Sequence, residues 1–219
     1  MLALTDGAVL LRDFIETDIE DYVRWETTET EWKLWDAPWE HAGQTEEQRA
    51  ASLREDVAWM RAHAQEVALL RDDAPRRRFE ICVVDTVGRG PCLAEVREGA
   101  RDARLETGEG CSALHIGGVS TYRIDDDFSI AGDGAHVALG IDINSMVARG
   151  HGYAPRALRL FMDYLFDQGE RELYCQTWSG NVRMIKLAQK LGFVECCRKR
   201  GIREVRGENC DGLTFVLKR

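Results

Sequence analysis

A glycine-punctuated stretch, Arg149-Gly150-His151-Gly152-Tyr153-Ala154, lies between an apolar run, residues 137–143, and an amphipathic segment, residues 155–167. Glycines let the backbone turn sharply and approach a ligand closely. The first turn of a helix leaves N–H groups unpaired and carries partial positive charge, so phosphate groups bind there. Arg149 adds a forked, charged set of donors. The pattern favours a pyrophosphate site, although two glycines in a loop also suit an ordinary turn.

The loop differs from two common phosphate-binding motifs. The dinucleotide fingerprint has a third glycine three residues after the second, and Pro155 stands at that position here. The phosphate loop of ATPases requires Gly-Lys-Ser/Thr, which does not follow. The flanking elements must therefore supply the rest of the interpretation.

The whole chain has the size and composition of one globular domain. Its 219 residues predict a single domain over 1–219, and 44% hydrophobic residues suffice for a sizeable core. A formal net charge of −9 argues against nucleic-acid binding. The sequence shows no long apolar run, so we expect no membrane contact. Seven cysteines without a Cys-x-x-Cys pair predict reduced thiols in a cytoplasmic protein and no metal site.

Periodicity predicts a mixed α/β (α+β) fold. Strands with alternating or continuous apolar residues are expected at 9–14, 79–85, 114–124, 136–143, 173–178, 193–198 and 213–217. Helices are expected from Thr17 and Thr45, which both have capping-box spacing, at 155–167 with Pro155 in the first position, and at 181–191. Asn181 should cap the last helix and Gly192 should close it in the left-handed conformation, and Gly117-Gly118 indicates a bulge in the strand at 114–124. We interpret residues 86–113 as a loop or hairpin insertion around a short strand-like piece at 93–97. The order predicts a mainly antiparallel central sheet flanked by about four helices.

Several pieces together resemble the GNAT superfamily of acyl-CoA-dependent N-acetyltransferases, and most nearly its Rim-type branch, which acetylates ribosomal-protein N-termini. The match is carried by Gly140-Ile141-Asp142-Ile143, by the glycine stretch, by Asn181 and by Lys190-Leu191-Gly192-Phe193. It is firm over 136–194 and looser over about 8–219. The resemblance implies a GNAT-like sheet with a splayed strand pair and acetyl-CoA as the cofactor.

The resemblance also assigns cofactor-binding residues. Main-chain groups of Ile143 and Asn144 would pair with the pantetheine arm and polarise the thioester. The loop residues Arg149, Gly150, His151, Gly152, Tyr153 and Ala154 would hold the pyrophosphate, and Asn181 would hydrogen-bond the cofactor. Three departures matter: the span from Gly140 to Gly150 is about one residue longer than the usual pattern, Pro155-Arg156 replaces the usual Thr-Glu, and Met184 stands where this branch often has serine.

No acid–base residue is inherited clearly from the resemblance. Asp142, on the strand beside the expected thioester, is the candidate catalytic base, with a hydrogen-bonded structural carboxylate as the alternative. His136 and Tyr153 are interpreted as core or packing residues. Cys196 and Cys197 would allow a covalent acyl-enzyme, but direct transfer to an amine needs none.

A tryptophan-rich segment between the first two helices is the other distinctive feature. Trp32, Trp35 and Trp39, with Trp178 at a strand end, are candidates for the acceptor site, because indole faces favour cations. The alternative is that they cover the edge of the sheet. We expect residues 31–40 to lie at the mouth of the cleft opposite the cofactor.

Two functions fit these observations. The first is N-acetyltransferase activity that transfers an acetyl group from acetyl-CoA to a primary amine by direct attack. The acceptor would be a peptide or protein N-terminus or a small amine. The second is a catalytically weak acyl-CoA-binding sensor or interaction protein on the same fold. The sequence leaves the oligomeric state open, and a homodimer is compatible with it.

Overall fold

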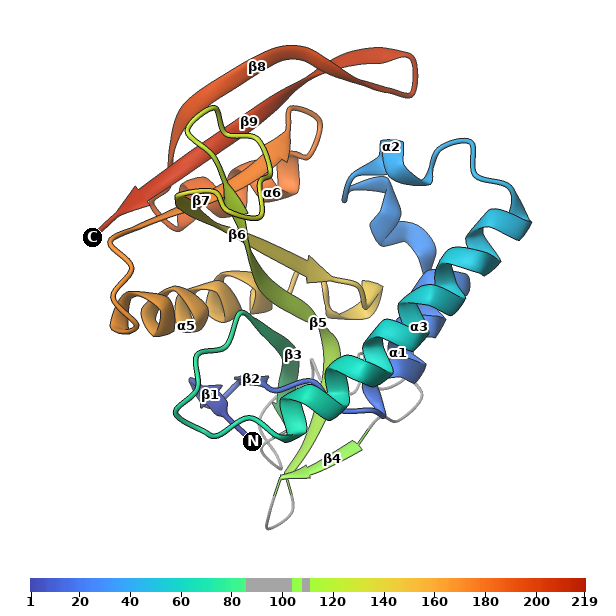
Figure 1. The fold of residues 1–219 in the computed structure, drawn as a ribbon, viewed down its shortest axis with the longest axis vertical. Coiled ribbons are helices and arrows are strands. Elements are labelled where there is room, and N and C mark those ends of the chain that lie inside the picture. The colour runs from blue at the N-terminus through green and yellow to red at the C-terminus, as the bar shows by residue number, and fades with distance from the viewer. Residues whose placement is uncertain (86–103, 108–110) are drawn as a thin grey trace.

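The computed structural model describes residues 1–85, 104–107 and 111–219 (Figure 1). One nine-stranded sheet runs through it in the order β1-β2-β3-β5-β6-β7-β9-β8, with β4 paired to β5. Among the described strands, only β6 and β7 pair in parallel. The strands are β1 (Ala3–Thr5), β2 (Val9–Arg12), β3 (Arg78–Asp85), β4 (Arg104–Thr107), β5 (Cys111–Ile124), β6 (His136–Ile143), β7 (Glu172–Trp178), β8 (Val194–Val205) and β9 (Glu208–Lys218).

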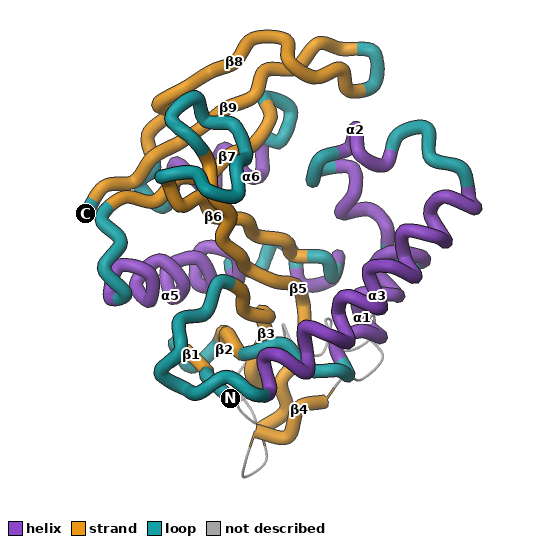
Figure 2. The backbone as a smooth tube through the Cα atoms, in the orientation of Figure 1, coloured by secondary structure: helices purple, strands orange, loops and turns teal. Residues whose placement is uncertain are grey.

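Helices cover both faces of the sheet. In Figures 1 and 2, α1 and α3 lie together on one flank, while α5 lies on the other side of the sheet. In the described part, no helix is long and apolar enough to cross a membrane. The helical elements are α1 (Asp18–Thr27), η1 (Thr30–Leu34), α2 (Pro38–His41), α3 (Glu46–Ala68), η2 (Met146–Ala148), α5 (Tyr153–Asp167) and α6 (Val182–Lys190).

Strand alternation separates an apolar face from a polar one. In β3, Phe79 and Ile81 are fully buried in the main core, which includes Phe161 of α5. Glu80 points to the opposite face, where its carboxylate accepts a hydrogen bond from Tyr22 of α1. Because side chains alternate along a strand, one set lies under α5 and the other lies under α1. The second face is where the polar site forms.

Several predicted features are confirmed. Thr45 and Gln48 form the complete capping box at the start of α3. Gly192, with φ of +91°, follows the end of α6 in the left-handed conformation that suits glycine. A register shift opposite Ile81 and Cys82 leaves a bulge beside Gly117, as the paired glycines indicated.

Other expectations were wrong in detail. Thr17 makes no side-chain cap for α1. Instead, Asp18 accepts from the backbone N–H of Ile15 at 2.9 Å and from buried Arg12 at the end of β2, so an ion pair to the preceding strand fixes the start of this helix. Pro155 is the third residue of α5 rather than the first. β8 and β9 are also longer than predicted, because their residues pair into an extended hairpin.

Within the predicted insertion, residues 86–113, the structure describes only residues 104–107 and 111–113. Arg104–Thr107 pairs with β5 as a short hairpin strand. The strand-like piece proposed at 93–97 lies outside the described residues.

Candidate active site

The two central strands diverge, as the predicted splayed pair requires. β6 pairs with β7 at Ala138–Tyr174 and Leu139–Cys175. Beyond Leu139 no further pairing with β7 occurs in the described chain, although β6 continues to Ile143. On its other edge, β6 remains paired with β5 as far as Ile143. The end of β6 therefore has one edge available to an extended ligand.

The glycine stretch connects β6 to α5. Gly150 and Gly152 have φ of +81° and +79°, a conformation that favours glycine. A Cβ at either position would meet no heavy atom within 4 Å, so the loop is open there. α5 begins at Tyr153, directly after the second glycine, and Ala154 lies in its first turn. His151 is exposed and stacks on Tyr153 with 5.8 Å between ring centroids. Open space beside a helix N-terminus fits the phosphates of coenzyme A.

Arg149 ties this loop to two other segments. Its Nε donates to the backbone oxygen of Ile143 at 2.8 Å. Its Nη1 forms an ion pair with Glu31 of η1. The guanidinium of Arg149 is thus held at the end of β6 while a carboxylate already lies against it.

Asn181 is engaged on both sides of its amide. Its Oδ1 accepts from the backbone N–H of Met184 at 3.1 Å, which confirms it as the N-cap of α6. Its Nδ2 donates to the backbone oxygen of Trp35 at 3.0 Å. The Nε1 of Trp178 donates to the same oxygen at 2.8 Å.

These contacts correct the predicted position of the tryptophan segment. Trp35 lies against Asn181, and the guanidinium of Arg183 lies 4.0 Å from the centre of its ring. With the Glu31–Arg149 pair, this places residues 31–35 beside the expected cofactor groups rather than at the opposite mouth. The sequence could not show this, because the first loop and the N-terminus of α6 are brought together only by the sheet.

The four tryptophans also have different surroundings. Trp39 packs edge-on against Trp178 with 6.4 Å between ring centroids. Together with Val205 and Cys210 they form a small cluster under the β8–β9 hairpin. Trp32 alone among the four lines the cavity described next.

A cavity of about 170 Å³ lies between α1, η1, the start of β3, the middle of β5 and the end of β6. Its polar members include Asp36 at the exposed mouth, Asp142 on β6 and Asn144 just beyond β6. The complete lining is Tyr22, Glu26, Trp32, Asp36, Arg78, Gly118, Val119, Ser120, Asp142 and Asn144. The cavity is therefore rich in carboxylates and adjoins the point where β6 and β7 separate.

Asp142 has the properties of a group that can exchange a proton near neutral pH. Burial, reinforced by the charge of Asp36, raises the pKa of Asp142 to about 7. Arg78 opposes this shift, but its guanidinium is committed to Glu80 at 2.9 Å and to the hydroxyl of Tyr22 at 2.6 Å. Among the described residues, neither Asp36 nor Asp142 forms an ion pair within 4 Å.

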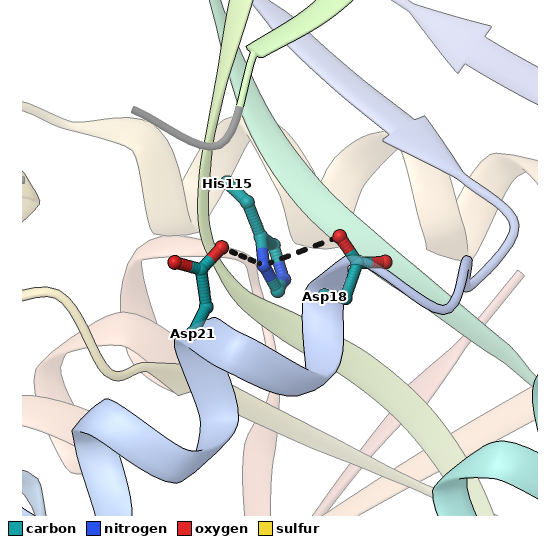
Figure 3. A group of neighbouring side chains, drawn as sticks. All are labelled: Asp18, Asp21 and His115. Carbon is teal, nitrogen blue, oxygen red and sulfur yellow. Dashed lines mark hydrogen bonds and ion pairs between the residues drawn. The ribbon is translucent and has the colours of Figure 1, made fainter. Parts of the chain in front are cut away.

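A buried ionic network adjoins this cavity through Tyr22 and Arg78 of its lining, and Figure 3 shows the part of the network around His115. Tyr22 donates to Glu80 at 2.6 Å, and Nε2 of His115 lies 3.0 Å from the same carboxylate. Figure 3 shows His115 reaching from β5 to α1, where its Nδ1 lies 2.9 Å from Asp21 and 3.6 Å from Asp18. Burial opposes the charge of His115, but these carboxylates outweigh it and raise its pKa to about 9.

Asp18, Asp21 and His115 have the composition of a metal site, with ligand atoms within 4.8 Å of one another. Their charges are nevertheless balanced by the protein itself. Arg12 makes two hydrogen bonds of 2.6 Å to Asp18, and Arg24 pairs with Asp21 at 2.7 Å. With His115 protonated as well, the cluster acts as an ionic support for α1 and needs no added cation.

Five residues of this region were not predicted from the sequence as site residues: Tyr22, Asp36, Arg78, Glu80 and His115. One signal was available: Arg78 and Glu80 alternate with apolar residues in β3, so one face of that strand had to be polar. Gly118 gave another signal, because a glycine inside a strand can mark a close approach of another group. In the structure, a Cβ at Gly118 would lie 3.1 Å from the hydroxyl of Tyr22. Their partners on α1 and β5 could not be inferred from local spacing.

Comparison with known proteins gives the class. The model of the acetyltransferase (GNAT) domain matches residues 8–194. Together with the divergent strands and the loop, this defines an acyl-CoA-dependent N-acetyltransferase. The chain belongs to the GNAT acetyltransferase family. No curated protein sequence matches it.

Solved structures share the fold at low sequence identity. The ribosomal-protein-S5-alanine acetyltransferase from Vibrio fischeri has a TM-score of 0.60 at 15% identity, covering 100% of this chain and 97% of that one. Spermidine N-acetyltransferase from Vibrio cholerae, in complex with CoA and spermine, has a TM-score of 0.60 at 14% identity, and the match covers 97% of this chain and 96% of that one. The ribosomal L7/L12 alpha-N-protein acetyltransferase RimL, in complex with coenzyme A, has a TM-score of 0.58 at 10% identity and covers 99% and 97%. The two proteins named first act on different acceptors, so the shared fold does not select one.

Proposed function

We propose that this chain acetylates a primary amine by direct attack on acetyl-CoA, with Asp142 taking the proton from the acceptor ammonium. One observation carries the proposal: a carboxyl group whose pKa is about 7 lines an acidic cavity at the end of the diverging strand β6. A base poised near the working pH suits general base catalysis. Acetyl-CoA, when bound, supplies the acetyl group as an activated thioester.

The chain's own residues account for the cofactor site. The open glycine loop and the first turn of α5 would bind the pyrophosphate, and Arg149 would add a positive charge. Main-chain groups of Ile143 and Asn144, at the free edge of β6, would pair with the pantetheine arm. Asn181 would reach the cofactor after its amide leaves the backbone oxygen of Trp35.

The proton balance can be followed at Asp142. An ammonium ion gives one proton to the Asp142 carboxylate and becomes a neutral amine. Its nitrogen then bonds to the acetyl carbon as the carbon–sulfur bond breaks. A second proton leaves the nitrogen and balances the charge on the departing thiolate, so the products are a neutral amide and a thiol.

The positions of the cysteines support direct transfer. None of the described residues that line the cavity is a cysteine. Burial also raises the pKa of Cys82 and of Cys175 to about 12, which leaves both thiols poor nucleophiles.

The acceptor is a small amine or the N-terminus of a peptide or protein. The carboxylates of Asp36 and Asp142 and the indole of Trp32 favour a cation in the cavity. Both acceptor classes present such a cation, so a mixed panel is required.

The test is a panel assayed with acetyl-CoA for thiol release and for product mass. It contains 1,4-diaminobutane, spermidine, an aminoglycoside, and unblocked peptides that begin with Ala, Ser or Met. We expect turnover of at least one amine, with a product heavier by one acetyl group. Tight binding of CoA by calorimetry without thiol release on any amine would favour the sensor alternative and overturn the proposal.

A further inference from the structure

The side chain of Asn144 has a buried oxygen that lacks a hydrogen-bond partner among the described residues. Asn144 lines the cavity, it is 3% exposed, and in the described part of the chain its buried Oδ1 has no hydrogen-bond partner. Buried side-chain amides are nearly always hydrogen-bonded, and an orphaned one destabilises the fold. The unpaired atom is an acceptor, so the missing partner is a hydrogen-bond donor.

We infer that the side-chain amide of Asn144 binds the attacking nitrogen, and that Asn144 and Asp142 together select a primary over a secondary amine. This inference rests on the proposed function and names a specificity residue for it. The main-chain role expected for Asn144 toward the cofactor is separate, because it does not involve the side chain.

The other groups of the cavity indicate which donor is missing. Asp36 and Asp142 are acceptors, and the guanidinium of Arg78 is committed to Glu80 and Tyr22. The uncommitted polar groups are therefore mainly acceptors, which suits a ligand that carries N–H groups and no carbonyl. A pantetheine amide would bring its own carbonyl oxygen toward two carboxylates. An ammonium group has donors only.

Geometry along the chain supports two contacts to one nitrogen. Asp142 and Asn144 are two residues apart at the end of β6, and both line the same cavity. A primary ammonium has three N–H bonds, so it can satisfy both side chains and keep a third donor for Asp36. Once Asp142 has taken a proton, the bond to Asn144 still orients the nitrogen lone pair. In a secondary amine, an alkyl group replaces one of these donors.

A neutral amide also suits the position better than a carboxylate. A third negative charge near Asp36 and Asp142 would raise the pKa of Asp142 further. The proton would then remain on Asp142 at neutral pH, and the base would be lost. An amide oxygen accepts the hydrogen bond without that effect.

The test uses two variants and a neighbouring control. Asn144→Leu keeps the approximate shape without polar atoms, and Asn144→Ala removes the group. Ser145→Ala changes an adjacent buried residue that does not line the cavity. Each protein is assayed with the panel amine of highest kcat/KM and with the same compound methylated on the reacting nitrogen. Calorimetry gives the Kd for acetyl-CoA, and thermal melts give Tm.

We expect both Asn144 variants to raise the acceptor KM by about tenfold, as loss of a hydrogen bond to a charged group does. The preference in kcat/KM for the primary amine should fall by a similar factor. The Kd for acetyl-CoA should stay within about twofold and Tm should not fall in Asn144→Leu, because no existing bond is lost. Ser145→Ala should leave the preference unchanged.

Three results would overturn the inference. An unchanged kcat/KM preference for the primary amine in both Asn144 variants would show that the side-chain amide does not bind the attacking nitrogen. A weaker Kd for acetyl-CoA with the acceptor KM unchanged would assign the amide to the pantetheine arm. If the wild-type protein acetylates no amine, the proposed function fails together with the inference. If it acetylates an amine and the Asn144 variants keep its preference, only the inference fails.

Discussion

The carboxylate of Glu31 forms an ion pair with the guanidinium of Arg149, which joins η1 to the loop expected to hold the pyrophosphate. Glu31 also accepts from the indole N–H of Trp35 at 2.8 Å, and Arg183 lies 3.7 Å from the same carboxylate. A protein anion therefore lies against two arginines beside the cofactor loop. The segment that carries it also contributes Trp32 and Asp36 to the proposed acceptor cavity, so one segment contacts both sites.

Removing the Glu31 charge should strengthen coenzyme A binding. Phosphate groups would compete with Glu31 for Arg149, and Glu31→Gln ends that competition. Partly exposed ion pairs contribute about 0–1 kcal/mol, so we expect CoA to bind up to about fivefold more tightly. Calorimetry measures this, with Glu29→Gln as the control, because Glu29 pairs with Arg24 instead. Weaker binding in Glu31→Gln would show that Glu31 orients Arg149 for the cofactor.

The glycine loop should not tolerate an acidic side chain. Gly152→Asp would bring negative charge to the expected pyrophosphate and weaken acetyl-CoA binding at least about tenfold. Gly43→Asp is the matched control, since Gly43 has φ of +75° against +79° for Gly152 and both have open space around the Cβ position. The two variants should lose similar stability in thermal melts. Equal acetyl-CoA affinity in both variants would show that the pyrophosphate does not bind at this loop.

Asp142 should control the pH dependence of catalysis. The carboxylate is the active form of the base, so kcat/KM should rise with pH through about 7 and then level off. Asp142→Asn should lower kcat by about 10²- to 10⁴-fold. Exposed Asp163 on α5 provides the control Asp163→Asn, which should leave kcat unchanged.

Asp36 should shift that pH profile. Its negative charge helps to raise the pKa of Asp142, so Asp36→Asn should lower that pKa and move the acid limb to lower pH. The measurement is kcat/KM from pH 5 to 9 in both proteins. An acid limb that stays at the same pH in Asp36→Asn, or moves to higher pH, would contradict the electrostatic coupling of Asp36 to Asp142.

His115 should make stability fall in alkaline solution. Its folded-state pKa of about 9 exceeds the ordinary value of 6.5, so the imidazolium stabilises the fold fully below pH 6.5. That contribution is lost as pH rises from 6.5 through about 9. We expect His115→Gln to lose on the order of 3 kcal/mol at pH 6 and less at pH 9.5. Melts of His136→Gln, which changes a histidine nearer the surface, should show a much smaller and flatter effect.

Trp32 and Trp39 should separate acceptor binding from stability. Trp32 lines the cavity, so Trp32→Ala should raise the acceptor KM about five- to thirtyfold, equivalent to roughly 1–2 kcal/mol. Trp39 packs on Trp178 and under Arg203, so Trp39→Ala should instead lower stability by roughly 1–3 kcal/mol. Kinetics and melts on both variants decide this. The reverse pattern would place Trp39, and not Trp32, in the acceptor site.

The sequence by itself determined the local framework of the central region. The glycines of the loop, the Asn181 cap, Gly192 and the apolar periods of β6 and α5 depend on backbone conformation and on neighbours within a few residues. Such features can be read from spacing, because helices and strands have fixed periods. The diverging strand pair followed from the family resemblance of the same region, and pairing that ends at Leu139 confirms it.

Tertiary structure alone decided how the cavity is charged and what lies beside the loop. Asp21 and His115 meet across 94 positions, Tyr22 and Glu80 across 58, and Trp35 and Asn181 across 146. No periodic rule links residues so far apart. The pKa of Asp142 depends on burial and on Asp36, which approaches only when η1 folds over β6. Electrostatic effects of this kind depend on distance in space and on exclusion of water, and both are set by the packed fold.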